Sequence, residues 1–131
     1  MARVGSKNTL PEMNVRSALF RAGFRFRTHK KGLPGRPDLV LPKYRLAVFV
    51  HGCFWHSHNC RRGKKPSSNE EFWEKKLAGN VLRDKRNMAV LRKQGWTVRV
   101  IWTCNITVAT KRLVRELERR RSLFLIKARQ N

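Results

Sequence analysis

The sequence predicts an α/β protein in which helices flank a mixed β-sheet. Two runs of apolar, β-branched and aromatic residues, at 38–41 and 46–51, predict a pair of strands. A similar run at 96–102 predicts another strand, and segments with apolar residues at helical spacing precede and follow these runs. Helix, strands, helix, strand and helix, in this order, are typical of a layered α/β domain around a mixed sheet.

The N-terminal helix is predicted from its start and stop signals. Thr9-Leu10-Pro11-Glu12 is a capping box with proline just inside the helix start, and Gly23 ends the helix. Alternating residues at 24–27 predict a half-buried strand, and a basic loop rich in glycine and proline follows at 30–37.

The remaining elements follow from turns and apolar spacing. Residues 42–45 separate the two central strands and suit an antiparallel turn. Residues 68–71 could cap a short helix, and we expect a separate, longer helix at about 81–94. A final basic helix is predicted at about 110–127. Without an internal repeat or a linker, residues 1–131 are expected to form a single domain.

The charge balance indicates a polyanionic partner. The chain has 31 Lys and Arg against 8 Asp and Glu, a net charge of +23. Such a field attracts nucleic acid, although charge alone also fits ribosomal-type RNA binding or adsorption to a membrane surface. No apolar run approaches transmembrane length, and residues 1–7 lack the apolar core of a signal peptide. We therefore expect a cytoplasmic protein with reduced thiols.

Metal-ligating residue types are concentrated in one segment. Three of the four histidines and two of the three cysteines lie within residues 51–60. His58 and Cys60 supply two ligands at close range for a tetrahedral zinc ion, and Cys104, just past the 96–102 strand, is the predicted third. A buried small hydrophobic residue is the alternative for Cys104.

Asp84 is the predicted fourth zinc ligand. It shares the apolar face of its helix with Val81 and Met88, where an uncompensated aspartate would cost several kcal/mol. The alternative is an acid in the first turn of a helix, stabilised by the helix dipole. Cys53 is assigned to packing.

A closed zinc site leaves His51 and His56 for catalysis. Asp38 begins one arm of the predicted hairpin and His51 ends the other, so both lie at the same end of the sheet. Asp38 and the main-chain carbonyl of Val50 suit Mg²⁺, and the histidines could activate water or stabilise a leaving oxygen. A turn residue after proline is the alternative for Asp38.

Other residues near this end of the sheet allow two interpretations. Glu12 is either a helix-capping acid or an accessory catalytic carboxylate, and a surface role is expected for His29. The aromatic residues Phe54, Trp55 and Trp73 either pack in the core or wedge between base steps of DNA, and chemistry alone favours neither.

These residues together resemble the very-short-patch-repair (Vsr) endonucleases. The resemblance rests on Leu33-Pro34-Gly35-Arg36-Pro37-Asp38, on Lys43 to His56 with its specific His-Gly-Cys-Phe-Trp-His string, and on Gly95-Trp96-Thr97-Val98 and Ile101-Trp102-Thr103-Cys104. It implies a restriction-endonuclease-like fold. The implied reaction is a nick 5′ to the thymine of a T·G mismatch formed by deamination of 5-methylcytosine.

The resemblance also implies roles for individual residues. Mg²⁺ would be held by Asp38 and the Val50 carbonyl, with His51 and His56 catalytic and Glu12 accessory. Zinc would be held by His58, Cys60, Asp84 and Cys104, and Phe54, Trp55 and Trp73 would intercalate into DNA. The second acid and the lysine of the broader restriction-like pattern are absent, since Phe49-Val50-His51 stands in their place.

Two other functions fit the same sequence. One is a Vsr-fold nuclease of restriction, homing or mobile-element type that has no mismatch preference. The other is a zinc-stapled nucleic-acid-binding module without catalysis, which would leave Asp38, His51 and His56 without a role. For a patch-repair enzyme we expect a monomer acting on the bacterial nucleoid, with mismatch-repair proteins as candidate partners, since one nick needs one active site.

Overall fold

The computed structural model describes residues 9–64 and 66–130, so the expectation for residues 1–7 lies outside the described part. Four strands form one sheet in the order β1-β2-β3-β4, with these bounds: β1 (Arg27–Thr28), β2 (Leu39–Leu41), β3 (Leu46–His51) and β4 (Thr97–Trp102). The pairs β1–β2 and β2–β3 are antiparallel, whereas β3 and β4 run parallel. The predicted mixed sheet is confirmed.

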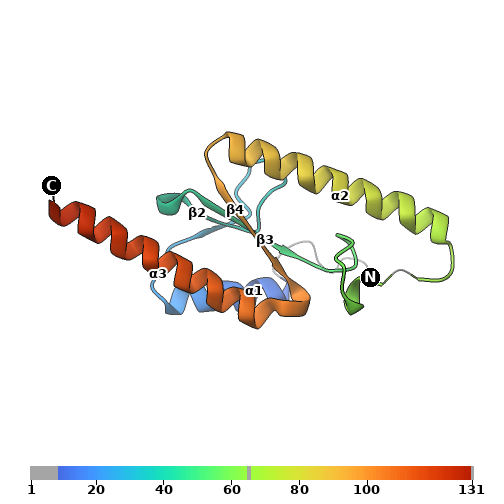
Figure 1. Ribbon diagram of the computed structural model, residues 1–131, viewed down its shortest axis with the longest axis horizontal. Coiled ribbons are helices and arrows are strands. Elements are labelled where there is room, and N and C mark those ends of the chain that lie inside the picture. The colour runs from blue at the N-terminus through green and yellow to red at the C-terminus, as the bar shows by residue number, and fades with distance from the viewer. Residues whose placement is uncertain (1–8, 65, 131) are drawn as a thin grey trace.

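Three helices cover the sheet: α1 (Leu10–Arg21), α2 (Glu70–Lys93) and α3 (Ile106–Gln130). Figure 1 shows α1 and α3 on one side of the sheet and α2 on the other. One buried cluster joins α1, α3 and one sheet face through Leu19, Leu46 and Leu117, and a second joins α2 and the other face through Phe49 and Leu91. Because β3 is covered on both faces, its sequence is continuously apolar instead of alternating.

Three predicted boundaries are wrong. The two helices expected between about 68 and 94 are one continuous helix, α2, in which Leu77 and Leu91 are both fully buried. A glycine within a helix costs only about 1 kcal/mol, so Gly79 does not break it. The strand expected at 24–27 is shifted to Arg27–Thr28, because Phe24 turns into the core against Tyr44. Helix α3 begins at Ile106, one turn before its predicted start.

The turn between β2 and β3 is tighter than a simple loop. Residues Pro42–Tyr44 form a 3₁₀ turn, and Arg45 follows in the left-handed region with φ 50°. The turn fixes the register of the hairpin, in which Leu41 pairs with Leu46 and Leu39 with Val48. The far end of this hairpin is where Asp38 and His51 lie. Within the described residues, no helix is both long enough and apolar enough to cross a membrane.

Candidate active site and metal centre

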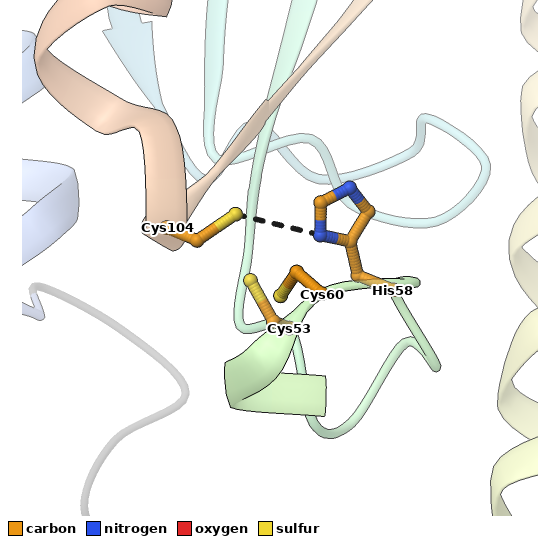
Figure 2. Close-up of side chains that lie close together, drawn as sticks. All are labelled: Cys53, His58, Cys60 and Cys104. Carbon is orange, nitrogen blue, oxygen red and sulfur yellow. Dashed lines mark hydrogen bonds between the residues drawn. The ribbon is translucent and has the colours of Figure 1, made fainter. Parts of the chain in front are cut away.

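Three thiols and one imidazole converge at the end of the sheet. Cys53 follows β3, His58 and Cys60 lie in the loop beyond it, and Cys104 directly follows β4. Figure 2 shows the four side chains pointing toward a common centre. One ligand atom from each lies within 4.8 Å of the others, and Cys104 Sγ is 3.5 Å from His58 Nδ1. Three sulfurs and one nitrogen can hold a metal ion.

The loop from Cys53 to Gly63 is folded tightly around this centre. The His58 amide donates to the Cys53 carbonyl at 2.9 Å, and the Cys60 amide donates to the His58 carbonyl at 2.8 Å. A Cβ atom on Gly63 would lie 2.0 Å from the His58 carbonyl oxygen, so glycine is required there. The His58 ring stacks on Trp102 of β4, with 4.1 Å between ring centroids. The sheet itself therefore orients this imidazole.

The thiols ionise unequally when they share this space. Burial raises the pKa of the Cys53 thiol, but hydrogen bonds from Thr103, Cys104 and Cys60 outweigh it and lower that pKa to about 6. The pKa of the Cys104 thiol rises to about 11 because of burial and the neighbouring Cys53 and Cys60. Three thiolates at such distances repel one another, so a cation is needed before all of them can be charged.

The expected zinc set differs from this cluster in one residue. His58, Cys60 and Cys104 come together as expected, but Cys53 takes the fourth place and Asp84 does not join them. Asp84 lies on α2 and hydrogen-bonds to Nδ1 of His56 instead. The reason lies in the loop: Ser57, in the left-handed region with φ 51°, separates His56 from His58, and the two imidazoles serve different clusters.

Asp38, Glu12 and His29 form a second cluster at the edge of β2. Their ligand atoms lie within 4.8 Å of one another. Asp38 Oδ2 accepts from the Val50 amide at 2.7 Å, which joins the carboxylate to β3. Glu12, only 1% exposed, contacts His29 Nε2 at 2.8 Å and is paired with Arg16 one turn along α1. Thr9 caps α1 by accepting from the Glu12 amide, so the carboxylate is left for these contacts.

The strand geometry indicates the direction of the Val50 carbonyl, whose amide donates to Asp38. Because a strand residue's N–H and C=O point to the same side, the Val50 carbonyl faces the β2 side, as its amide does. Continuing the β2–β3 register by two places sets Val50 opposite Pro37, which has no N–H to donate. The carboxylates of Asp38 and Glu12 make this pocket oxygen-rich.

Burial changes the ionisation of Asp38. Burial raises the pKa of the carboxyl group to about 6. The hydrogen bond from the Val50 amide lowers this pKa, and the charge of Glu12 raises it further. A bound cation would favour the charged carboxylate and reverse this rise. The arrangement thus fits a cation better than it fits two free carboxylates.

His51, His56 and Asp84 form a third cluster beside the second. The rings of His51 and His56 are stacked, with centroids 3.6 Å apart and planes 3° from parallel. Burial and the neighbouring His56 lower the pKa of His51 to about 4, although the carboxylate of Asp84 acts in the opposite direction and raises it. His51 is therefore neutral at pH 7. Its buried Nδ1 has no hydrogen-bond partner in the part of the chain that the structure describes.

The aromatic residues gather in a patch next to these clusters. The rings of Phe54 and Trp73 meet edge to face at 5.2 Å, and Trp55 lies 5.0 Å from Phe54. Trp55 is 47% exposed, and Phe72, which contacts Trp73, is 58% exposed. Trp55 and Phe72 are thus exposed at the surface, while Phe54 and Trp73 between them are half-buried.

Comparison with known proteins identifies the family. A family model described as DNA mismatch endonuclease Vsr matches residues 1–62. The chain is 51% identical over 107 residues to the type II nicking enzyme V.XorIIP of Xanthomonas oryzae pv. oryzae, covering 82% of this chain and 79% of the relative. The chain belongs to the Vsr family of DNA mismatch endonucleases.

Two further relatives belong to the same group. The type II nicking enzyme V.NmeAIP of Neisseria meningitidis is 44% identical over 124 residues, covering 90% of this chain and 89% of the relative. The DNA mismatch endonuclease Vsr of Escherichia coli is 41% identical over 104 residues, covering 79% of this chain and 67% of the relative. As a member of the Vsr family, the chain is an endonuclease.

Sequence reasoning missed three residues of this Vsr-family site. Cys53 lies in the same ten-residue segment as His58 and Cys60. Because three cysteines cannot all pair with one another, the odd number of thiols was a signal that all three bind one metal ion. His29 was expected at the surface, but its side chain is 17% exposed and faces Glu12. Phe72 extends the aromatic patch, and its position next to Trp73 was the available signal.

Proposed function

We propose that this protein nicks one strand of duplex DNA 5′ to the thymine of a T·G mismatch, by metal-dependent hydrolysis within a restriction-endonuclease-like fold. One observation supports this most strongly: Asp38 and Glu12 form one cluster, the stacked pair His51 and His56 belongs to another, and the two lie close enough for His56 to lower the pKa of Asp38. A non-catalytic binding module would not need two carboxylates buried beside two imidazoles, because burying them costs stability.

Asp38, the Val50 carbonyl and Glu12 would hold Mg²⁺, since hard oxygen ligands with open positions suit this ion. When bound there, the ion supplies charge stabilisation at the scissile phosphate and lowers the pKa of a bound water. The hydrogen bond from the Val50 amide orients Asp38, and Pro37, which lies opposite Val50 when the β2–β3 register is continued, has no N–H to donate to the Val50 carbonyl. The chain thereby provides a rigid oxygen face.

His56 is the proposed general base. Asp84 binds its Nδ1, which favours the tautomer that is protonated there and leaves the Nε2 lone pair free to take a proton from water. The Asp84 carboxylate then stabilises the imidazolium that forms, as in other His–Asp pairs. His51, held neutral by burial, positions the water or the leaving oxygen through hydrogen bonds and does not compete for the proton.

The proposed mismatch preference rests on the aromatic patch and on charge. Phe54, Trp55 and Trp73 form a contiguous wedge beside the catalytic residues, and inserting such a wedge between base steps costs least where pairing is already weak. The net charge of +23 supplies affinity for the phosphate backbone that does not depend on sequence. The Escherichia coli relative is named a mismatch endonuclease, which agrees with this preference.

A zinc ion at Cys53, His58, Cys60 and Cys104 is the proposed structural element of this enzyme. The set is closed by protein ligands, as in sites that stabilise folding and not in sites that bind substrate. It fixes the loop that contains both His56 and the first two aromatic residues. The positions of His56, Phe54 and Trp55 would therefore depend on the same zinc ion.

A strand-resolved cleavage assay tests this function. Matched duplexes and duplexes with one T·G mismatch in varied contexts are incubated with Mg²⁺ or with a chelator, together with Asp38→Ala and His56→Ala variants. A single nick beside the mismatched thymine, lost in both variants without loss of DNA affinity, is expected. Cutting of matched DNA would replace the proposal with the restriction or homing alternative, and absence of cutting with every metal would favour the binding module.

A further inference from the structure

His29 is held against the proposed cation site by both its backbone and its ring. The His29 amide donates to the Asp38 carbonyl at 3.2 Å, which extends the pairing of β1 with β2 by one residue. Its backbone lies in the left-handed region with φ 49°. Only a few per cent of non-glycine residues adopt this conformation, and such residues are concentrated at functional sites.

The ring of His29 reaches inward to Glu12. Its Nε2 is 2.8 Å from Glu12 Oε2, and the side chains are 17% and 1% exposed. Two neighbouring ligands of an octahedral ion with bonds near 2.1 Å lie about 3 Å apart, so this separation suits a shared cation as well as a hydrogen bond. Asp38 supplies a third ligand atom within 4.8 Å of both.

His29 contacts both charged neighbours of this pocket. Glu12 is already paired with Arg16, whose NH2 is also 3.4 Å from His29 Nε2. Because His29 Nε2 is directed at the carboxylates of Glu12 and Asp38, a cation bound by these two carboxylates would lie within reach of the imidazole nitrogen.

We infer that His29, together with Glu12 and Asp38, is a nitrogen ligand of the divalent cation. This rests on the cation site of the proposed function, but not on the choice of DNA substrate. Mn²⁺ suits the same carboxylate and carbonyl ligands as Mg²⁺, so it serves as a paramagnetic probe of this site.

Mn²⁺ binding to the zinc-loaded, full-length chain without DNA tests the inference. Electron paramagnetic resonance gives the affinity from the loss of the free-ion signal, and pulsed measurements on protein with ¹⁵N-labelled histidine detect a nitrogen bound to the manganese. The variants are His29→Gln, which keeps a hydrogen-bond donor for Glu12, and His29→Asn, which tolerates the left-handed backbone. Lys31→Gln, an exposed position in the same loop, is the control.

Both His29 variants are expected to bind Mn²⁺ at least about tenfold more weakly and to lose one nitrogen coupling, while Lys31→Gln matches the wild type. Unchanged Mn²⁺ affinity and coupling in both variants would overturn the inference and leave His29 as a hydrogen-bond partner of Glu12. If the wild type shows the coupling but nicks no mismatched DNA, the inference stands and the proposed function fails.

Discussion

His56 and His58 are two residues apart, yet they belong to chemically opposite clusters. His58 joins Cys53, Cys60 and Cys104, a sulfur-rich set closed by the protein and orientated by Trp102. His56 pairs with Asp84 and stacks on His51, next to the oxygen-rich pocket of Asp38 and Glu12.

The difference between these clusters separates stability from catalysis. A metal bound by all four residues of the sulfur-rich cluster would have no open position and would link the loop to β4, so the proposed role of such a metal is to stabilise the fold. The oxygen-rich pocket keeps a carboxyl group whose pKa is raised by burial, so the metal-free protein stores electrostatic strain there.

Removal of the structural metal should have the largest effect. Binding energy at such sites is folding energy, on the order of 10 kcal/mol, so stripped protein should lose the ordered loop and all nicking even with excess Mg²⁺. Calorimetry and cleavage assays of metal-stripped and zinc-restored protein measure this. Cys104→Ser should behave like the stripped protein, while the neighbouring exposed Asn105→Ala should not. A stripped protein with unchanged thermal midpoint and activity would show that the thiol cluster is no metal site.

Loss of the Asp84 carboxylate should affect catalysis and not folding. Asp84→Asn removes the charge that stabilises a protonated His56, so kcat should fall by about 10²–10⁴-fold with little change in DNA affinity. Single-turnover nicking and a binding titration separate these effects, with the exposed Glu71→Gln on the same helix as control. Equal loss of affinity and rate would assign Asp84 to DNA binding instead.

Asp38→Asn should stabilise the protein in Mg²⁺-free buffer. Because burial raises the pKa of Asp38 from 3.8 to about 6, the wild type keeps its full stability below pH 4 and loses part of it as the pH rises through 6. Asparagine still accepts from the Val50 amide but has no charge to bury. Its advantage should be about 2 kcal/mol at pH 8, after discounting for solvent screening, and should vanish near pH 4.

Thermal midpoints across this pH range measure the Asp38 effect, with the exposed Glu74→Gln as a control that should show no such dependence. A difference in thermal midpoint between Asp38→Asn and the wild type that stays constant at all pH values would contradict a raised pKa for Asp38 in the folded protein. Added Mg²⁺ should reduce the difference by stabilising the wild type alone.

Two glycines should respond oppositely to alanine. At Gly63 a Cβ would meet the His58 carbonyl oxygen at 2.0 Å, so Gly63→Ala should destabilise the zinc loop by about 2 kcal/mol and weaken metal retention. At Gly79, inside α2, nothing lies within 4 Å of the added Cβ, and alanine should stabilise the helix by about 1 kcal/mol. Denaturant unfolding of both variants gives the signs, and a stabilised Gly63→Ala would contradict the tight loop.

Local patterns predicted most of the fold. The hairpin of β2 and β3 and the mixed sheet follow from apolar runs and a proline-containing turn, and the start of α1 follows from its capping residue Thr9. The division of α2 was wrong because burial of Leu77 and Leu91 on one face outweighs the small cost of Gly79. Tertiary packing decides such cases, and spacing along the chain does not reveal it.

The site was predictable where strand ends fix positions and less so where loop geometry decides. Asp38 and His51 lie at the same end of the sheet because an antiparallel hairpin brings its open ends together. Asp84 was assigned to the wrong neighbour, because whether a helical aspartate faces His56 or His58 depends on the turn at Ser57. His29 reaches Glu12 because its backbone is in the left-handed region, which the neighbouring residues in the sequence do not predict.

Anomalous diffraction at the zinc and manganese edges, from crystals of zinc-loaded protein soaked in Mn²⁺, tests most directly whether two chemically distinct cation sites flank this loop. We expect a zinc peak among Cys53, His58, Cys60 and Cys104, and a manganese peak beside Asp38, within bonding distance of Glu12 and the Val50 carbonyl. A zinc ion ligated by Asp84, or manganese absent from Asp38 and bound between His51 and His56, would contradict it.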